Sequence, residues 1–375
     1  MFLKKLHLRS FRNYQDQGID FVAQKTILVG NNAQGKSNLL EAVELLATLK
    51  SHRTSRDRDL VLEGEEDSRI NAILERKYGS SELTINFKHK GRRTLILNQE
   101  KLRRQTEFLG VLNAVQFSSL DLDLVRGSPE NRRNWLDYLL IQLEPVYAYI
   151  LQQYNQILRQ RNAFLRKLRD LEVDINNHTA QLALWDAQLA ATGSRITRRR
   201  ARVLRRIAPI AASWHASISG ETENLAINYH PNINWQEDNP EHVQQAFLNK
   251  IQQRRIPEQQ QGTTLVGPHR DEVELTINET PVRSYGSQGQ QRTLVLALKL
   301  AELKLIEEVI GEPPLLLLDD VLAELDLNRQ NQLLEAIQDN FQTLITTTHL
   351  SAFDHQWVKD SQILTVEKGL IIDGN

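Results

Sequence analysis

The chain has 375 residues and no cysteine, which excludes disulfides, thiolate zinc sites and cysteine nucleophiles. It carries 46 lysines and arginines against 47 aspartates and glutamates, a net charge of −1, so any surface for nucleic acid must be local. Hydrophobic residues make up 40%, as in an ordinary soluble protein, and the length favours about two to three domains. Because the sequence holds no apolar run long enough to span a bilayer and no secretory signal, we expect a cytoplasmic protein without a membrane partner.

The N-terminal stretch up to about residue 30 is predicted to form two strands around a turn. Leu6 and Leu8 alternate with polar residues, and Gly18 precedes a second apolar run. Between them lies Phe11-Arg12-Asn13-Tyr14. Arg12 and Asn13 would either reach a nucleotide or form a solvated turn, and spacing alone leaves both interpretations open.

The next stretch, Gly30-Asn31-Asn32-Ala33-Gln34-Gly35-Lys36-Ser37, fits the phosphate-binding pattern G-x-x-x-x-G-K-[ST] at every position. The two glycines let backbone N–H groups approach a triphosphate, with the positive end of a helix behind them. Lys36 would reach the outer phosphates, and the Ser37 hydroxyl would hold Mg²⁺. A buried-strand run precedes this loop and a helix-forming run follows it, so the motif predicts a nucleotide site.

Two later regions concentrate positive charge. Alternation over residues 70–97 predicts antiparallel strands, and this section with its continuation carries a first candidate surface for phosphate backbones: Lys88, Lys90, Arg92, Arg93, Lys101, Arg103 and Arg104. Residues 129–219 are predicted to be helical, with an apolar stripe from Leu182 to Trp214 along one long helix. Its opposite face is either a solvated face or a second nucleic-acid surface: Arg195, Arg198, Arg199, Arg200, Arg202, Arg205 and Arg206. For the arginine-rich residues 51–59, composition favours a solvated loop over a contact with nucleotide or nucleic-acid phosphate.

The chain is expected to return from this helical region within the polar residues 221–261. Ser287-Gln288-Gly289-Gln290-Gln291-Arg292 then runs into a strong helix, which makes a second anion site. A run of four leucines leads to Asp319 and Asp320, a buried parallel strand ending where a Mg²⁺ ligand and a water-activating base are needed. A further strand ends in His349, which in this order is better explained by the site than by structure alone.

The order of these motifs, with the turn Glu324-Leu325-Asp326 between the last two strands, resembles the ABC-type ATPase heads of the SMC family. Within that group the chain resembles the RecF family of recombination mediators from end to end. The segments that carry this resemblance are Phe11-Arg12-Asn13-Tyr14, the phosphate loop, Ser51-His52-Arg53-Thr54, Gly127-Ser128-Pro129 with Arg132-Arg133, Gln160-Arg161-Asn162 and Ser287-Gln288-Gly289-Gln290-Gln291-Arg292.

The resemblance implies an α/β fold, an ABC/SMC-like P-loop ATPase head over residues 1–130 and 262–375 with an inserted α-helical arm over 131–261. Asp319 with Ser37 would hold Mg²⁺, and Asp320 stands where such heads place the catalytic carboxylate, usually Glu. Gln116 would position the attacking water, and His349 would contact the γ-phosphate. The segment after Gln116 reads Ser118-Ser119-Leu120-Asp121 where the family usually has Pro-Glu-Asp. The implied nucleotide-binding residues are Arg12, Asn13, Gly30 to Ser37, Ser287, Gln288, Gly289 and Gln290.

The resemblance also implies a function: an ATP-induced homodimer that acts as a clamp on double-stranded, gapped or single-strand junction DNA. Slow, DNA-dependent ATP hydrolysis would release it, and it would work with RecR and RecO in loading RecA at gaps and stalled forks. The candidate DNA-binding residues are Arg92, Arg93, Arg103, Arg104, Arg198 and Arg199. The alternatives are another SMC-like ATPase of DNA metabolism or defence, and a DNA-binding protein that nucleotide stabilises without a hydrolysis cycle.

Overall fold

The computed structural model describes residues 1–375 except 172–177, 323–324, 338–339, 351–352, 354 and 374–375. The chain divides into two compact units: Met1–Leu122, Ser213–Glu223 and Gln288–Asn375 form the first, and Asp123–Ala212 and Asn224–Ser287 the second. The predicted boundaries after residues 130 and 261 both fall inside the second unit.

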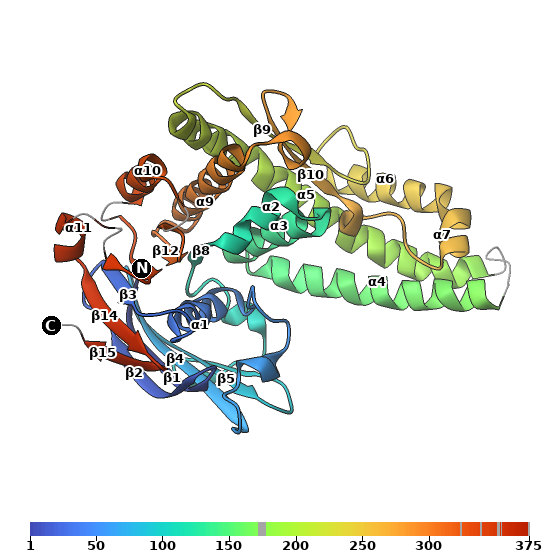
Figure 1. The fold of residues 1–375 in the computed structure, drawn as a ribbon. Helices are drawn as coiled ribbons and strands as arrows, with labels where there is room; N and C mark the ends of the chain where they lie inside the picture. Colours follow the sequence, from blue (N-terminus) through green and yellow to red (C-terminus); the bar gives the residue numbers. More distant parts are fainter. Residues whose placement is uncertain (172–177, 323–324, 338–339, 351–352, 354, 374–375) are drawn as a thin grey trace. The chain divides into compact units, whose positions relative to one another are not determined.

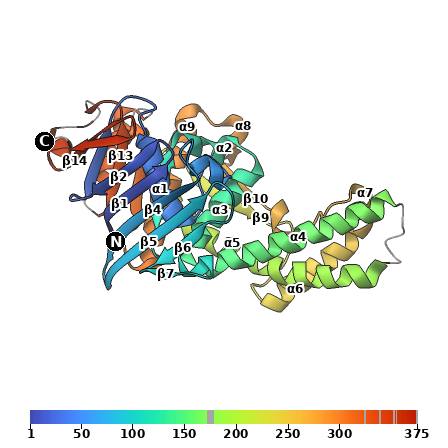
Figure 2. The ribbon, with the colours of Figure 1, turned by 90° about the horizontal axis from the view of Figure 1, so that it is seen from below.

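The first unit begins with an antiparallel sheet in the order β2-β1-β4-β5-β6-β7 (Figure 2). Its alternating sequences bury one face of the sheet, and Leu3, Leu6 and Leu8 of the first strand are almost fully buried. The antiparallel strands predicted for residues 70–97 are confirmed. The strands are β1 (Phe2–Phe11), β2 (Tyr14–Asp20), β4 (Asp67–Arg76), β5 (Gly79–Lys88), β6 (Thr94–Leu97) and β7 (Glu100–Lys101).

The second sheet of this unit has the order β15-β14-β3-β13-β12-β8 and is parallel except for β15. The predicted leucine strand is β12, and its four leucines are at most 1% exposed because the strand is covered on both faces. The strands are β3 (Lys25–Val29), β8 (Ala114–Ser118), β12 (Leu315–Asp319), β13 (Thr343–Thr347), β14 (Gln362–Glu367) and β15 (Leu370–Asp373).

Helix α1 (Lys36–Thr48) packs against strands of both sheets and is buried along most of its length. Its buried leucines and Ala42 account for the apolar side of that packing. The other helices of the first unit are α9 (Gln288–Ile310), α10 (Leu327–Ile337) and α11 (His355–Lys359), with short 3₁₀ turns at Asp57–Leu60, Gln105–Glu107 and Ser119–Leu122.

The second unit is mainly helical, and its long helices α4 and α5 lie side by side (Figure 1). In its described residues, the predicted helical stretch 129–219 forms α3, α4 and α5, and α3 ends before Pro145. The helices are α2 (Asp123–Arg126), α3 (Pro129–Leu143), α4 (Val146–Asp170), α5 (Thr179–Ser219, whose last residues belong to the first unit), α6 (Pro240–Gln253), α7 (Arg255–Gln261) and α8 (Val282–Tyr285).

This unit also contains a three-stranded antiparallel sheet, in the order β11-β10-β9. Its strands are β9 (Leu225–His230), β10 (Glu272–Ile277) and β11 (Thr280–Pro281), and a 3₁₀ turn at Pro268–Arg270 precedes β10. The residues after 262 therefore pair with β9, and the first unit resumes only at Gln288. Among the described helices, none combines the length and the apolar character that crossing a bilayer requires.

Candidate nucleotide site

The predicted phosphate loop connects β3 to α1, in the strand-loop-helix order that the motif requires. Both motif glycines are needed for packing as well as for phosphate approach. Gly35 has a φ of 120°, and a Cβ there would lie 2.7 Å from Asn13 Nδ2. A Cβ on Gly30 would collide with the carbonyl oxygen of Val366. A side chain at either position would displace the loop.

Residues from both ends of the chain hold this loop in place. The Gln34 carbonyl accepts hydrogen bonds from Asn13 Nδ2 and from the Gly369 N–H, both at 2.9 Å. The Tyr14 hydroxyl donates to the Gly35 carbonyl at 2.9 Å, and burial raises the pKa of Tyr14, which keeps it a donor. The loop is therefore preformed.

The Lys36 ammonium donates to the carbonyls of Gly30 and Asn31, at 2.7 and 3.0 Å. It lies across the mouth of its own loop and is only 4% exposed. A buried cation whose hydrogen bonds within the described part of the chain go to loop carbonyls has the chemistry that a phosphate needs, because charge-assisted bonds to an anion are stronger than bonds to neutral carbonyls. Lys36 thus fits the predicted phosphate role.

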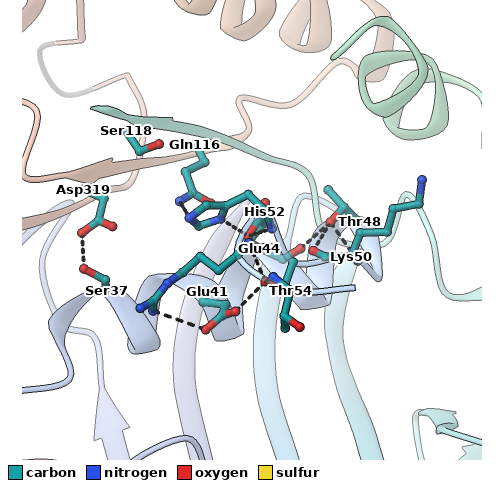
Figure 3. A network of polar contacts seen from close by, with 12 residues as sticks. Ser37, Glu41, Glu44, Thr48, Lys50, His52, Thr54, Gln116, Ser118 and Asp319 are labelled. Atoms are coloured by element: carbon teal, nitrogen blue, oxygen red, sulfur yellow. Dashed lines mark hydrogen bonds and ion pairs between the residues drawn. The ribbon is translucent and has the colours of Figure 1, made fainter. Parts of the chain in front are cut away.

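Two hydroxyls converge on the carboxylate of Asp319, and Figure 3 shows the contact that Ser37 makes. Ser37 Oγ donates to Asp319 Oδ1 at 2.7 Å, and Thr346 Oγ1 donates to the same oxygen at 2.8 Å. Carboxylate and hydroxyl oxygens are the hard ligands that Mg²⁺ prefers, so Ser37 and Asp319 fit the metal role predicted for them. The sequence analysis did not identify Thr346, although the run of three threonines at the end of β13 marks its position.

Asp320 directly follows this carboxylate in a left-handed conformation, with φ of 53°. Its N–H donates to Thr346 Oγ1 at 2.9 Å. Burial raises the pKa of Asp320; Lys36 lowers it and Asp319 raises it. A half-buried carboxylate with a raised pKa is suited to accept a proton.

Arg12 lies behind the loop. It forms a two-point ion pair with the fully buried Glu41 of α1, at 2.6 and 2.8 Å, and donates to the Asp59 carbonyl at 2.7 Å. Asn13 supports the loop through Gln34, and its Oδ1 accepts from Asn38. Asn13 thus holds the loop and Arg12 is fixed to α1, and direct contact of either residue with nucleotide stays a prediction.

Gln116 is half-buried on β8, and its side chain contacts His52, a residue with no role in the sequence analysis (Figure 3). His349 is exposed after β13, as are Ser287 and Gln288 at the start of α9. Gln290 donates to Glu223 at 2.8 Å, and the Gly289 carbonyl accepts from Arg329. Within the described part of the chain, neither Gln288 nor Gly289 is hydrogen-bonded to the phosphate loop.

The two basic surfaces differ in how much of their charge is available. In the first, Arg92, Arg103 and Arg104 are exposed, whereas Arg93 is paired with Asp57 at 2.6 Å. The backbone N–H of Leu102 donates to the Leu95 carbonyl near the start of β6. The residues after β7 therefore lie close to the start of β6, which Arg92 precedes by two residues. This end of the sheet therefore carries three exposed arginines that form no ion pair with the residues the structure describes.

The second surface, on α5, is partly neutralised, while its Arg195, Arg205 and Arg206 are exposed. Arg198 and Arg202 both pair with Asp238, and Arg199 pairs with Glu144. Arg200 was expected on the same exposed face, but it is 3% exposed and pairs with Asp137 and Asp271. The acids that neutralise these arginines come from distant segments, so the local composition did not reveal them.

Comparisons with known proteins agree on one family. A domain model described as RecF/RecN/SMC N-terminal domain matches residues 2–371. The DNA replication and repair protein RecF of Nostoc punctiforme is 72% identical over 99% of both chains, and that of Gloeothece citriformis is 69% identical over the full length of both.

Solved structures agree. The recombination mediator protein RecF with ATP, from the RecFOR pathway, superimposes with a TM-score of 0.91 at 32% identity, over 100% of this chain and 98% of that one. The Smc head of Pyrococcus furiosus gives 0.55 at 16% identity, over 100% and 96%, which shows the fold alone. The predicted α/β fold with an SMC-like ATPase head is confirmed.

Proposed function

The chain belongs to the RecF family of DNA replication and repair proteins, and from this premise we propose that it is an ATP-switched homodimer that clamps DNA. A role in recombinational repair and an ATP-binding head of the ATPase type come with the family. The proposal adds that the bound nucleotide controls DNA binding. It also retains the helical arm as a region distinct from the ATPase head.

The convergence of Ser37 and Thr346 on Asp319, next to Lys36, is the observation that carries the proposal. Lys36 would bind the outer phosphates once it releases the loop carbonyls, and Ser37 and Asp319 would hold Mg²⁺. Bound Mg²⁺ would neutralise part of the negative charge of the phosphoryl group that ATP supplies. Asp320 would accept a proton from the attacking water, which Gln116 would orient. A purely structural nucleotide would not require a second carboxylate of raised pKa at this strand end.

The second half of the site would come from another copy of the chain. Ser287 and Gln288 are exposed at the start of α9, where backbone N–H groups can bind an anion. We expect them to close on ATP held by the facing subunit, with the exposed His349 beside the γ-phosphate. Because each ATP would touch both subunits, loss of the γ-phosphate would weaken the dimer and release DNA.

Ser287→Arg tests this arrangement by sedimentation with ATP, with ADP and without nucleotide. We expect the wild type to be a dimer only with ATP, and the variant to stay monomeric, because the larger side chain blocks close approach to the phosphate. Ser284→Arg, an equally exposed serine of the same segment, is the matched control and should still dimerise. A wild type that is monomeric throughout contradicts the clamp, and a dimer indifferent to nucleotide contradicts the switch.

For DNA, the exposure of Arg92, Arg103 and Arg104 favours the first basic surface. Replacing all three by Ala should reduce the slope of log affinity against log salt by about three, one for each lost phosphate contact. Arg198→Ala with Arg199→Ala should leave that slope nearly unchanged, because Asp238 and Glu144 already neutralise these side chains. The opposite ranking of the two variants would place DNA over α5. Fluorescence anisotropy with labelled duplex and gapped DNA, repeated over a range of salt concentrations, measures the slope for each variant.

The partners proposed from the resemblance are RecR and RecO, with RecA loaded at gaps and stalled forks. Support comes from the solved relative, which is described as a recombination mediator in the RecFOR pathway. Recognition through phosphates, without base readout, suits a protein that must act wherever a gap occurs.

A further inference from the structure

Helix α1 carries a polar stripe that begins at the phosphate loop. Ser37, Glu41, Glu44 and Thr48 follow one another at helical spacing on one face, and Figure 3 shows this stripe facing the loop that follows the helix. Ser51 Oγ donates to Glu41 at 2.5 Å, and Arg53 lies 3.6 Å from the same carboxylate. The residues after α1 are therefore fixed to the helix that holds Ser37, in contrast to the solvated loop expected for them.

The imidazole of His52 is fixed by Glu44 within this loop. Glu44 Oε2 accepts from the His52 backbone N–H at 3.3 Å and contacts His52 Nδ1 at 2.6 Å. Because a carboxylate accepts, the hydrogen of a neutral imidazole resides on Nδ1, which leaves Nε2 as an acceptor. The geometry thus selects one tautomer.

The free nitrogen of this imidazole faces Gln116. His52 Nε2 lies 3.4 Å from Gln116 Nε2, so a neutral His52 accepts from the amide NH₂. The other end of the amide, Gln116 Oε1, is buried and has no hydrogen-bond partner among the described residues. Gln116 is two residues before Ser118 on β8, and Ser118 pairs with Asp319 on the neighbouring strand β12. Along the strand direction, Gln116 therefore lies about 7 Å from the level of Asp319. An unpartnered acceptor lies next to the catalytic centre.

We propose that His52 is a positioning residue that determines which end of the Gln116 amide points away from the imidazole. With neutral His52 the amide oxygen is free to accept a hydrogen from the attacking water. With charged His52 the Nε2–H repels the amide NH₂, and a half-turn of the amide brings Oε1 to His52 instead. The NH₂ then points outward and cannot accept from water. The inference rests on the role of Gln116 in the proposed function.

The charges around His52 set the pH range of this switch. Burial lowers the pKa of His52, but the hydrogen bond and charge of Glu44, with the charges of Glu41 and Asp319, raise it above its ordinary value near 6.5. Burial raises the pKa of Glu44 itself. Of the other charges in the network, Arg12 and Arg53 both lie against Glu41. Hydrolysis should therefore increase as pH rises through the pKa of His52.

The decisive experiment measures the pH profile of the turnover number with DNA present, for wild type and His52→Gln. Glutamine keeps a hydrogen-bonding end but does not titrate, so the acidic limb that belongs to His52 should disappear while turnover at high pH is retained. His52→Ala should lose about 10-fold in turnover with ATP affinity unchanged, the loss expected for one neutral hydrogen bond. His7→Gln, a histidine paired with Asp16 in the same unit, is the matched control. An acidic limb that persists in His52→Gln belongs to another group, such as Asp320, and overturns the proposal.

A second readout does not depend on hydrolysis. Nitrogen chemical shifts of His52 should show the Nδ1–H tautomer in the neutral wild type and loss of that preference in Glu44→Gln. An Nε2–H tautomer in the wild type overturns the proposal whatever the kinetics. A wild type that shows the expected tautomer but hydrolyses no ATP at any pH contradicts the proposed ATPase cycle, and with it the catalytic role of the switch, but not the geometry.

Discussion

Asp320→Asn is expected to reduce ATP hydrolysis by at least about 100-fold, because it removes the proton acceptor while it keeps the size and the backbone contact of the side chain. The Asp320 N–H still donates to Thr346, and Asp319 still accepts from Ser37, so ATP binding should persist. Without hydrolysis the ATP-bound dimer should accumulate and hold DNA longer. Single-turnover phosphate release and DNA dissociation rates measure the two effects.

The control for this variant is Asp360→Asn, an exposed carboxylate in the same unit, which should leave both rates unchanged. Loss of ATP binding in Asp320→Asn would mean that the carboxylate is structural or holds the metal. A rate within a few-fold of wild type would assign proton transfer to another group.

Arg200→Met is expected to destabilise the second unit by about 3–5 kcal/mol, because it leaves buried carboxylates without their cation. Arg200 donates to both oxygens of Asp137 at 2.9 Å, to Asp271 at 3.2 Å and to the Pro268 carbonyl at 2.6 Å. These contacts connect α5 to α3 and to the segment before β10. Urea unfolding followed by far-ultraviolet circular dichroism measures the loss.

Arg202→Met provides the comparison, since Arg202 lies on the same helix but pairs with Asp238 at the surface, where an ion pair contributes about 0–1 kcal/mol. The loss of unfolding free energy in Arg200→Met should become smaller as pH falls. The carboxyl groups of Asp137 and Asp271, which have lost their cation, then bind protons and become neutral. Burial already raises the pKa of Asp271 in the wild type. Equal losses in the two variants would show that Arg200 acts through packing alone.

The placement of the phosphate loop beside Asp319 was largely predictable because its signals are local. The loop Gly30 to Ser37 is a contiguous pattern, and Asp319 follows a leucine run that favours a buried strand. His52 and Thr346 were missed for a different reason. Their roles depend on which side chains meet in the folded chain. The sequence around Glu44 does not indicate that the loop after α1 brings His52 into contact with it.

The fold of the second unit was less predictable. Strands β9 and β10 pair across about 40 residues of helix and turn, so neither carries a local sign of its partner. The arginines of α5 read as a charged face because their acids, Asp137, Asp238 and Asp271, come from other segments. Composition reports charge, whereas pairing is a property of the tertiary structure.

The position of β3 in its sheet has a consequence for synthesis of the protein. β3 leads into the phosphate loop, yet both of its neighbours, β13 and β14, lie more than 300 residues later, and Gly369 holds the loop itself. A growing chain on the ribosome therefore carries the complete loop sequence through more than 300 further residues before both neighbouring strands of β3 exist. We therefore expect the phosphate loop to become ordered only after β13 and β14 have been made.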